Sequence, residues 1–336
     1  MKQLIVTCLP SFYKNLAFKR IAQHTSLKVF FTYDSKIKRE GDFFRYELNE
    51  ENIVKNTSKF YNIKNLYLES KKSDYVTLGG WDDLYFWFLR FVVPKHKLRL
   101  IVESSIYEFR HSKLLTPIKR IFISGIAECI VSGQPHSRLV KKLGFKGKIT
   151  ISRGVGVLDF DYKPKIKSKP DEIINFLYVG RVSEDKGLDL LFTFFKKNQD
   201  LHLNIVGSIE NEKYLDVINK NHNITFHGYK NRHELKDIYD SNDVFVLASL
   251  VEPWGLVVEE ALYHGLPVML SDKVGCNEDL VKFYNVGEVF ETNNLEDLSE
   301  KMLNMRNVDQ YIKYCSNINS IDFNDISNNY VKSFYD

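Results

Sequence analysis

The chain contains few cysteines and no hydrophobic run long enough to cross a bilayer. Its 336 residues include four cysteines, none of them in a CxxC pair or a metal-ligand spacing. So few cysteines in so long a chain indicate a reducing compartment, and we expect a cytoplasmic protein. The most apolar run, residues 84–93, is about half the length of a transmembrane helix and contains Arg90. Residues 1–14 have too short an apolar core for a secretion signal, so we expect a first strand there.

Internal repeats and low-complexity tracts are also missing, and the length suggests about two domains. The net charge of +4 conceals an asymmetry. Residues 1–164 contain 29 Lys and Arg against 15 Asp and Glu, whereas the remainder contains 18 against 28. The basic half could face anionic lipid, nucleic acid or an anionic acceptor, or it could be an ordinary solvated surface. Since no nucleic-acid-binding motif is present, we expect no nucleic-acid partner.

Short apolar segments alternate with amphipathic ones in two successive series. The first series predicts strands at 4–7, 27–33, 75–78, 100–103, 129–132 and 148–152, and helices at 11–21, 83–92, 112–126 and 135–143. The second predicts strands at 176–180, 203–207, 224–228, 244–248 and 266–270, and helices at 187–197, 211–221, 231–240 and 256–264. Apolar strands alternating with helices predict two doubly wound α/β domains with parallel sheets.

The boundary between these domains is expected where Gly, Pro and Lys cluster, at about residues 152–170. We therefore predict a first domain at 1–160 and a second at 161–317, with a C-terminal helix at about 318–336 that packs back on the first. Because such sheets bind ligands beyond the carboxyl ends of their strands, a cleft between the two facing domains is the expected site.

The stretch FLYVGRVSEDKGLDLL, residues 176–191, is the first with predicted chemistry. A strand ends at Gly180, which lets a ligand approach the backbone. Arg181 and Lys186 follow near the carboxyl end of that strand, where a guanidinium and an ammonium can grip a diphosphate. The alternative is a strand–loop–helix turn with two solvated cations.

A second stretch, EPWGLVVEEALYHGLPV at residues 252–268, has carboxylates on both sides of a glycine turn. A helix is expected from about Leu256, and its amide groups would attract an anion. Glu252 precedes this helix and could reach sugar hydroxyls, and Glu260 could accept hydrogen bonds from a ribose. Alternatively, Glu252 only complements the helix dipole and Glu260 is solvated. Glu259 fits such an ordinary solvated role, since it points about 100° away from Glu260.

Together, Gly180-Arg181, Lys186-Gly187 and the pair Glu252 and Glu260 resemble the C-terminal domain of family-4 glycosyltransferases, which have the GT-B fold and retain anomeric configuration. The likeness is strong from about 176 to 290 and weaker in the N-terminal half. It implies two facing Rossmann-like domains and a nucleotide-diphosphate sugar as the donor, without a cofactor.

This resemblance implies a role for each matching residue. Arg181 and Lys186 would neutralise the diphosphate leaving group, Glu252 would bind the donor sugar, and Glu260 the ribose. The backbone of Gly255, Leu256 and Val257 would meet the phosphates or sugar, and the backbone around Tyr229 would border the base. No metal is then required. The one literal DxD, Asp159 to Asp161, lies at the domain join, so a metal role for it is disfavoured.

The predicted acceptor residues follow strands of the first domain. Glu103, at a strand end before Ser104, would touch the donor sugar or the acceptor hydroxyl as a ligand or a base; alternatively, it caps the next helix. Asp82 could bind an acceptor hydroxyl and Trp81 could stack on a sugar, unless Gly79–Asp83 is only a glycine turn with a helix cap. Tyr13 lies in the loop after the first strand, which resembles the family's opening loop but lacks its glycines.

We therefore expect a retaining glycosyltransferase that acts on a saccharide or lipid-linked saccharide acceptor, in keeping with bacterial surface polysaccharide synthesis. The alternatives are a sugar-nucleotide epimerase on the same fold, a nicotinamide oxidoreductase, and a basic nucleic-acid-binding protein. The helix around 111–123 is a candidate for contact with an anionic inner leaflet, since Lys113, Lys119 and Arg120 stand beside Leu114, Leu115, Ile118 and Phe122. Apolar residues at this spacing are, however, more often core.

Overall fold

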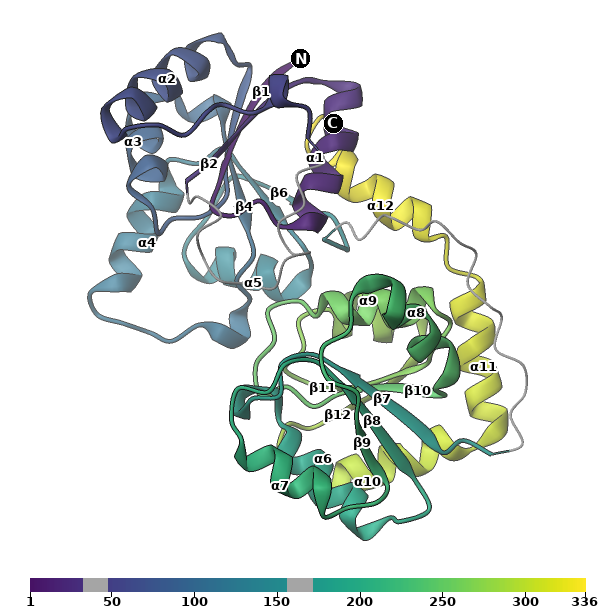
Figure 1. Cartoon of the computed structure of the whole chain (residues 1–336). Coiled ribbons are helices and arrows are strands. Elements are labelled where there is room, and N and C mark those ends of the chain that lie inside the picture. Colours follow the sequence, from purple (N-terminus) through teal and green to yellow (C-terminus); the bar gives the residue numbers. More distant parts are fainter. Residues whose placement is uncertain (33–47, 156–171) are drawn as a thin grey trace. The chain divides into compact units, whose positions relative to one another are not determined.

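The computed structural model describes residues 1–32, 48–155 and 172–336. It divides the chain into two units, whose elements are labelled in Figure 1. Unit 1 comprises Met1–Asp159 and Asn324–Asp336, and unit 2 comprises Phe160–Phe323. The end of the chain therefore belongs to unit 1, from residue 324 onward.

Unit 1 is built on a six-stranded parallel sheet with the strand order β2-β1-β3-β4-β5-β6. Its strands are β1 (Lys2–Thr7), β2 (Ser26–Phe31), β3 (Tyr75–Leu78), β4 (Leu98–Val102), β5 (Glu128–Val131) and β6 (Lys148–Ile151). Most of their residues are apolar and buried, as expected for strands covered on both faces.

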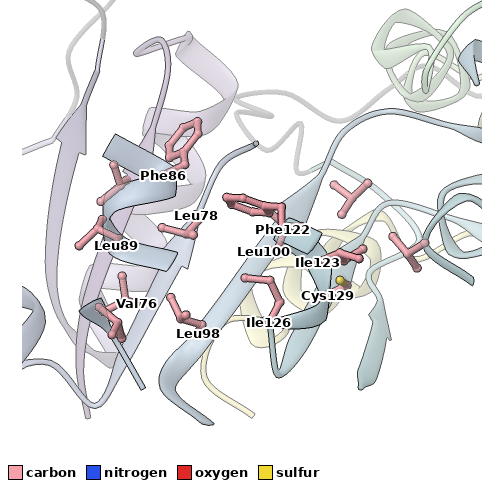
Figure 2. Close-up of a cluster of buried hydrophobic side chains, with 14 of the residues drawn as sticks. Val76, Leu78, Phe86, Leu89, Leu98, Leu100, Phe122, Ile123, Ile126 and Cys129 are labelled. Atoms are coloured by element: carbon pink, nitrogen blue, oxygen red, sulfur yellow. The ribbon is translucent and has the colours of Figure 1, made fainter. Parts of the chain in front are cut away.

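Helices cover both faces of this sheet. They are α1 (Phe12–His24), α2 (Lys59–Lys72), α3 (Leu84–Val92), α4 (Leu115–Ser124), α5 (Gln134–Lys142) and α12 (Phe323–Lys332). Buried residues of α2 to α5 form one apolar cluster with the sheet, whereas those of α1 and α12 form another. Figure 2 shows the first cluster, in which Phe86 of α3 and Phe122 of α4 lie near Leu78 and Leu100 of the sheet.

Unit 2 has the same architecture, with the strand order β12-β11-β10-β7-β8-β9, again all parallel. Its strands are β7 (Asn175–Val179), β8 (His202–Val206), β9 (Ile224–Phe226), β10 (Val244–Leu247), β11 (Val268–Ser271) and β12 (Gly287–Phe290). Its helices are α6 (Leu188–Lys197), α7 (Lys213–Asn219), α8 (Arg232–Ser241), α9 (Leu256–Tyr263), α10 (Leu295–Arg306) and α11 (Val308–Asn319). The predicted pair of doubly wound α/β sheets is confirmed.

The single helix expected at about 318–336 corresponds to α12, which is shorter and spans Phe323–Lys332. Two helices, α11 and α12, are separated by residues 320–322, where Ser320 and Asp322 favour a helix end. After α12, the carbonyl oxygen of Phe334 accepts hydrogen bonds from Gln3 and from Arg99, at 2.7 Å each, which fasten the chain end to unit 1. None of the helices in the described ranges is long and apolar enough to span a membrane.

Candidate functional site

Because the strands of unit 2 are parallel, their carboxyl ends share one edge of the sheet. Gly180 follows β7 and Gly207 follows the neighbouring β8. A Cβ on Gly207 would lie 1.8 Å from the carbonyl oxygen of Gly180, so only glycine lets the two chain segments approach this closely. Arg181 leaves the sheet at this point.

Lys186 is positioned by a turn that packs against the segment following β10. Gly187, at the end of this turn, has a φ of +67°, and a Cβ on it would lie 2.0 Å from the carbonyl oxygen of Ala248. The amide of Leu250 donates to the carbonyl of Asp185 at 2.9 Å. These contacts bring the Nζ atom of Lys186 to 2.5 Å from Oε2 of Glu252, with the two side chains 13% and 18% exposed.

Arg181, which follows the end of β7, lies next to the same aspartate as Lys186. Its Nη2 atom lies 3.6 Å from Oδ2 of Asp185, and Nζ of Lys186 lies 4.0 Å from that same oxygen. Its Nη1 atom forms a 2.6 Å ion pair with Glu210. Burial would raise the pKa of Asp185, but a hydrogen bond from Ser183 and the charges of Lys186 and Arg181 hold it below its ordinary value. The two predicted phosphate-binding cations therefore converge.

The Pro-Trp-Gly turn is held by backbone pairing with residues 273–275. The amide of Glu252 donates to Lys273 at 3.0 Å, and Gly275 donates back to Glu252 at 2.9 Å. The indole Nε1 of Trp254 donates to Oε1 of Glu259 at 2.5 Å, and both side chains are buried. The expectation that Glu259 is a solvated helix residue is wrong, because its carboxylate satisfies the buried indole.

Helix α9 begins directly after this turn. Gly255 has a φ of +96°, a conformation that strongly favours glycine, and it supplies no capping side chain to the first turn. Leu256 and Val257 form that turn and are partly buried. The positive end of the helix dipole at Leu256 thus follows Glu252 by four residues.

Glu260, on α9, accepts a hydrogen bond of 3.2 Å from the hydroxyl of Tyr239 on α8. The Tyr239 ring stacks on His264, with ring centroids 4.6 Å apart, and Nδ1 of His264 lies 3.2 Å from Asp240. Glu260 is thus held by a buried phenol rather than fully solvated. Tyr229 follows β9 on the same sheet edge, and its side chain is exposed.

In unit 1, Glu103 follows β4 and pairs with Lys14 of α1 at 2.8 Å. Burial would lower the pKa of Lys14, but the Glu103 carboxylate outweighs this effect, and the pKa lies above its ordinary value. The alternative that Glu103 caps the following helix is wrong, because Ser105 occupies the N-cap position of the 3₁₀ turn at Ile106–Glu108.

The other predicted acceptor residues lie at the carboxyl ends of β1 and β3. Asp83, rather than Asp82, caps α3, by accepting from the amide of Tyr85 at 2.8 Å. Asp82 is exposed and Trp81 is partly buried, with the ammonium of Lys119 5.1 Å from its ring centroid. Tyr13 is also partly buried. Tyr13 is also one of the groups that raise the pKa of Lys14, after Glu103, so it lies near the Lys14–Glu103 pair.

Sequence reasoning missed several partners of the predicted residues, notably Lys14, Glu210 and Tyr239. Each is distant in sequence from the residue that it contacts, so periodicity gives no signal. The position of Lys14 soon after the first strand, on the same sheet edge as Glu103, was the available clue. Asp159 and Asp161 lie outside the described residues, and the absence of a metal stays a prediction.

Known proteins resemble this chain both in sequence and in fold. Residues 159–317 match the family model described as glycosyl transferases group 1. An uncharacterised glycosyltransferase of Methanocaldococcus jannaschii is 34% identical over 143 residues, which are 40% of this chain and 34% of that protein. The chain therefore covers about a third of the length of this curated relative.

Solved structures resemble the chain over its whole length. The Anabaena protein HepE in complex with UDP has a TM-score of 0.75 at 14% identity, and the match covers 99% of each chain. The lipopolysaccharide outer core galactosyltransferase WaaB has a TM-score of 0.70 at 16% identity, covering 100% of this chain and 99% of that one. Residues 159–317 are thus similar to the group 1 glycosyl transferases, and the chain has the GT-B fold of these solved structures.

Proposed function

We propose that this protein is a retaining, metal-independent glycosyltransferase that moves a sugar from a nucleotide-diphosphate sugar to a hydroxyl of a saccharide or lipid-linked saccharide. The observation that carries the proposal is the convergence of two cations. Arg181 and Lys186 both lie within 4.0 Å of one oxygen of Asp185. Glu252, in the turn that precedes α9, forms an ion pair with Lys186.

The bond that breaks in this reaction joins the anomeric carbon of the sugar to the diphosphate oxygen. Negative charge then develops on the diphosphate, and Arg181, Lys186 and the first turn of α9 would stabilise it. The acceptor oxygen forms the new bond on the same face of the sugar, and its proton passes to the departing phosphate. Glu252 would orient the donor sugar and Glu260 the ribose, while Tyr229 would border the base.

In unit 1, we assign the acceptor to the carboxyl edge of the sheet. Glu103 is held there by Lys14, with Tyr13, Trp81 and Asp82 after neighbouring strands. We further propose a lipid-linked acceptor of surface polysaccharide synthesis and a peripheral position on the inner face of the membrane. The likeness in fold to WaaB, a galactosyltransferase of the lipopolysaccharide outer core, supports this choice of acceptor.

A thermal-stabilisation screen of nucleotide sugars tests the donor site. At a hundred times the dissociation constant, a true donor should stabilise the folded protein by about 2.7 kcal/mol. UDP-sugars are tried first, because HepE was solved with UDP-glucose. Arg181→Ala and Glu260→Ala should each lose most of the effect. Arg306→Ala is the matched control, since Arg306 forms a 2.9 Å ion pair with Asp200 elsewhere in unit 2.

Product analysis then separates transfer from epimerisation. A transferase releases the nucleoside diphosphate and extends an added saccharide acceptor, and the new linkage keeps the anomeric configuration of the donor. Release of an isomerised sugar nucleotide without an acceptor would contradict the proposal, as would a screen in which no nucleotide sugar stabilises the protein.

A further inference from the structure

We propose that the outer faces of α2, α3 and α4 form a docking surface for a bilayer that contains anionic phospholipid. The inference rests on the proposed function for its purpose, which is access to a lipid-linked acceptor. The three helices all belong to unit 1, whereas the proposed donor site lies in unit 2.

Helix α4 presents the clearest signal. The sequence favoured core positions for its apolar residues, but only part of them is buried. Phe122 and Ile123 pack into the core, whereas Leu114 and Leu115 are 73% and 57% exposed. Ile118 and Ile121 continue the exposed face at 40% and 56%. With the positions i, i+4 and i+7, Leu114, Ile118 and Ile121 form one stripe that faces away from the sheet.

Helices α2 and α3 repeat this arrangement. On α3, Leu84 and Phe91, seven residues apart, are 79% and 69% exposed, and Trp87 between them contacts Phe91 with ring centroids 6.0 Å apart. On α2, the exposed large apolar residues are Phe60, Tyr61, Ile63, Tyr67 and Leu68. Exposed apolar side chains on three successive helices form a large patch. Such a patch is unusual on a surface that faces only water.

The three helices lie side by side. Asn62 of α2 donates to the hydroxyl of Tyr85 on α3 at 3.0 Å. Trp87 of α3 contacts Phe122 of α4 with ring centroids 4.9 Å apart, and Arg90 donates to the carbonyl of Phe122 at 2.8 Å. All three pack on the same apolar cluster, and Figure 1 shows them following one another along one side of unit 1. Their outer faces are therefore continuous.

The charge of this surface selects its partner. Helices α3 and α4 contain no Asp or Glu, and they carry the cations Arg90, Lys119 and Arg120. Helix α2 carries four lysines against one glutamate. Apolar and aromatic side chains interleaved with cations suit the interface of an anionic bilayer, where lysine stems extend toward phosphate groups. A second copy of this chain is disfavoured, because it would bring two positive faces together.

Unit 2 provides the contrast. In the part of unit 2 that the structure describes, the exposed large apolar residues are distributed over different elements: Leu215, Tyr229, Val251, Phe283, Leu303 and Ile312. Isolated exposure of this kind is ordinary and needs no partner. The concentration on α2 to α4 is therefore a property of unit 1.

Vesicle co-sedimentation tests the docking surface with the full chain. We expect vesicles that mix phosphatidylglycerol with phosphatidylcholine to retain the protein at low salt, and vesicles of phosphatidylcholine alone to retain it far less. The variant combines Leu84→Glu with Leu115→Glu. Both positions are the first residue of a helix, where a carboxylate complements the helix dipole and the fold should persist. The matched control is Leu303→Glu, at a residue 69% exposed on α10.

The double variant should lower the partition coefficient by about tenfold or more, and the control should leave it unchanged. Equal retention of the double variant and the parent protein would overturn the proposal. So would a parent protein that ignores anionic vesicles, or a concentration-dependent dimer that the double variant abolishes. Stabilisation by the nucleotide sugar should survive in the double variant, which separates a failed docking surface from a failed donor site.

Discussion

The ammonium of Lys186 and the carboxylate of Glu252 meet at 2.5 Å, although they are 66 residues apart in sequence. The first follows β7 and the second follows β10, which are neighbours in the sheet of unit 2. Since the strands are parallel, the segments after them leave at the same edge. This pair joins the proposed diphosphate cations to the turn that begins α9.

Removing the ammonium should abolish most of the transfer reaction. We expect Lys186→Ala to lower kcat by about 10²- to 10³-fold, since one preorganised group that stabilises developing negative charge is worth that much. Initial-rate measurement with the donor from the screen checks this. Lys213→Ala is the control, because Lys213 forms an exposed 2.6 Å pair with Glu184 in the same unit and should retain activity. Loss of activity in both variants would argue against a specific role.

Tyr239 should act as a positioning residue for Glu260. Tyr239→Phe removes the hydroxyl that donates to the carboxylate at 3.2 Å, so we expect the KM for the donor to rise about tenfold with little change in kcat. Deoxyribose donors that lack the contacted ribose hydroxyl should show a smaller effect. Tyr311→Phe is the control. It removes a hydroxyl that donates a hydrogen bond to the Asp243 carbonyl at 3.1 Å, and it should leave KM unchanged. An equal rise in KM for both kinds of donor would refute this role.

Gly187 and Gly228 provide a matched pair for the turn that carries Lys186. Their φ values are +67° and +69°, but a Cβ on Gly187 would meet the Ala248 carbonyl at 2.0 Å, whereas a Cβ on Gly228 would have no atom within 4 Å. Gly228→Ala should lower the free energy of unfolding by about 1 kcal/mol, for the left-handed backbone alone. Gly187→Ala should cost about 3 kcal/mol, since overpacking adds to that cost. Urea titration of both variants checks the difference, and equal losses would contradict the close approach.

His136 should make the stability of unit 1 depend on pH. Burial lowers the pKa of its imidazole to about 4, despite a hydrogen bond to the Glu103 backbone. As the pH falls, His136 is therefore protonated in the unfolded chain before it is protonated in the folded protein. The free energy of unfolding decreases as the pH falls below about 6.5 toward 4. The loss between pH 7 and pH 5 should be about 2 kcal/mol.

Urea unfolding of His136→Asn at the two pH values checks this expectation. The variant should lose that share of the pH dependence, whereas substitution of His233, an exposed residue on α8, should keep it. Parallel pH profiles for the parent protein and His136→Asn would show that His136 is not responsible.

The Lys14–Glu103 pair should affect the acceptor and not the donor. Glu103→Gln and Lys14→Met should each raise the KM for the acceptor severalfold, because the carboxylate loses its charge or the partner that orients it. Thermal stabilisation by the donor, which we assign to unit 2, should stay unchanged. A variant that loses donor stabilisation while keeping the acceptor KM would contradict the assignment.

Much of the fold could be read from the sequence, because buried parallel strands are unbroken apolar runs. FLYVG and VFVLA correspond to β7 and β10 within one residue at each end. Strand β12 was missed, since its residues GEVF contain glycine and glutamate. Helix α2 was missed because its large apolar residues face outward, so its pattern does not mark a core face.

The candidate site was predicted in part for the same reason. Strand ends indicated which residues share an edge, but not which side chains meet. The hydrogen bond from Tyr239 to Glu260 depends on how α8 packs against α9, which no local pattern encodes. The contact of Trp254 with Glu259 is local, but it depends on the shape of the turn before α9.

Binding calorimetry with nucleoside diphosphates and the corresponding monophosphates tests the central claim most directly. If Arg181, Lys186 and the start of α9 hold the diphosphate, the parent protein should bind one diphosphate, UDP tried first, at least about tenfold more tightly than its monophosphate. Arg181→Ala and Lys186→Ala should each erase most of that preference and leave monophosphate binding nearly unchanged. A preference that persists in both variants would contradict the account.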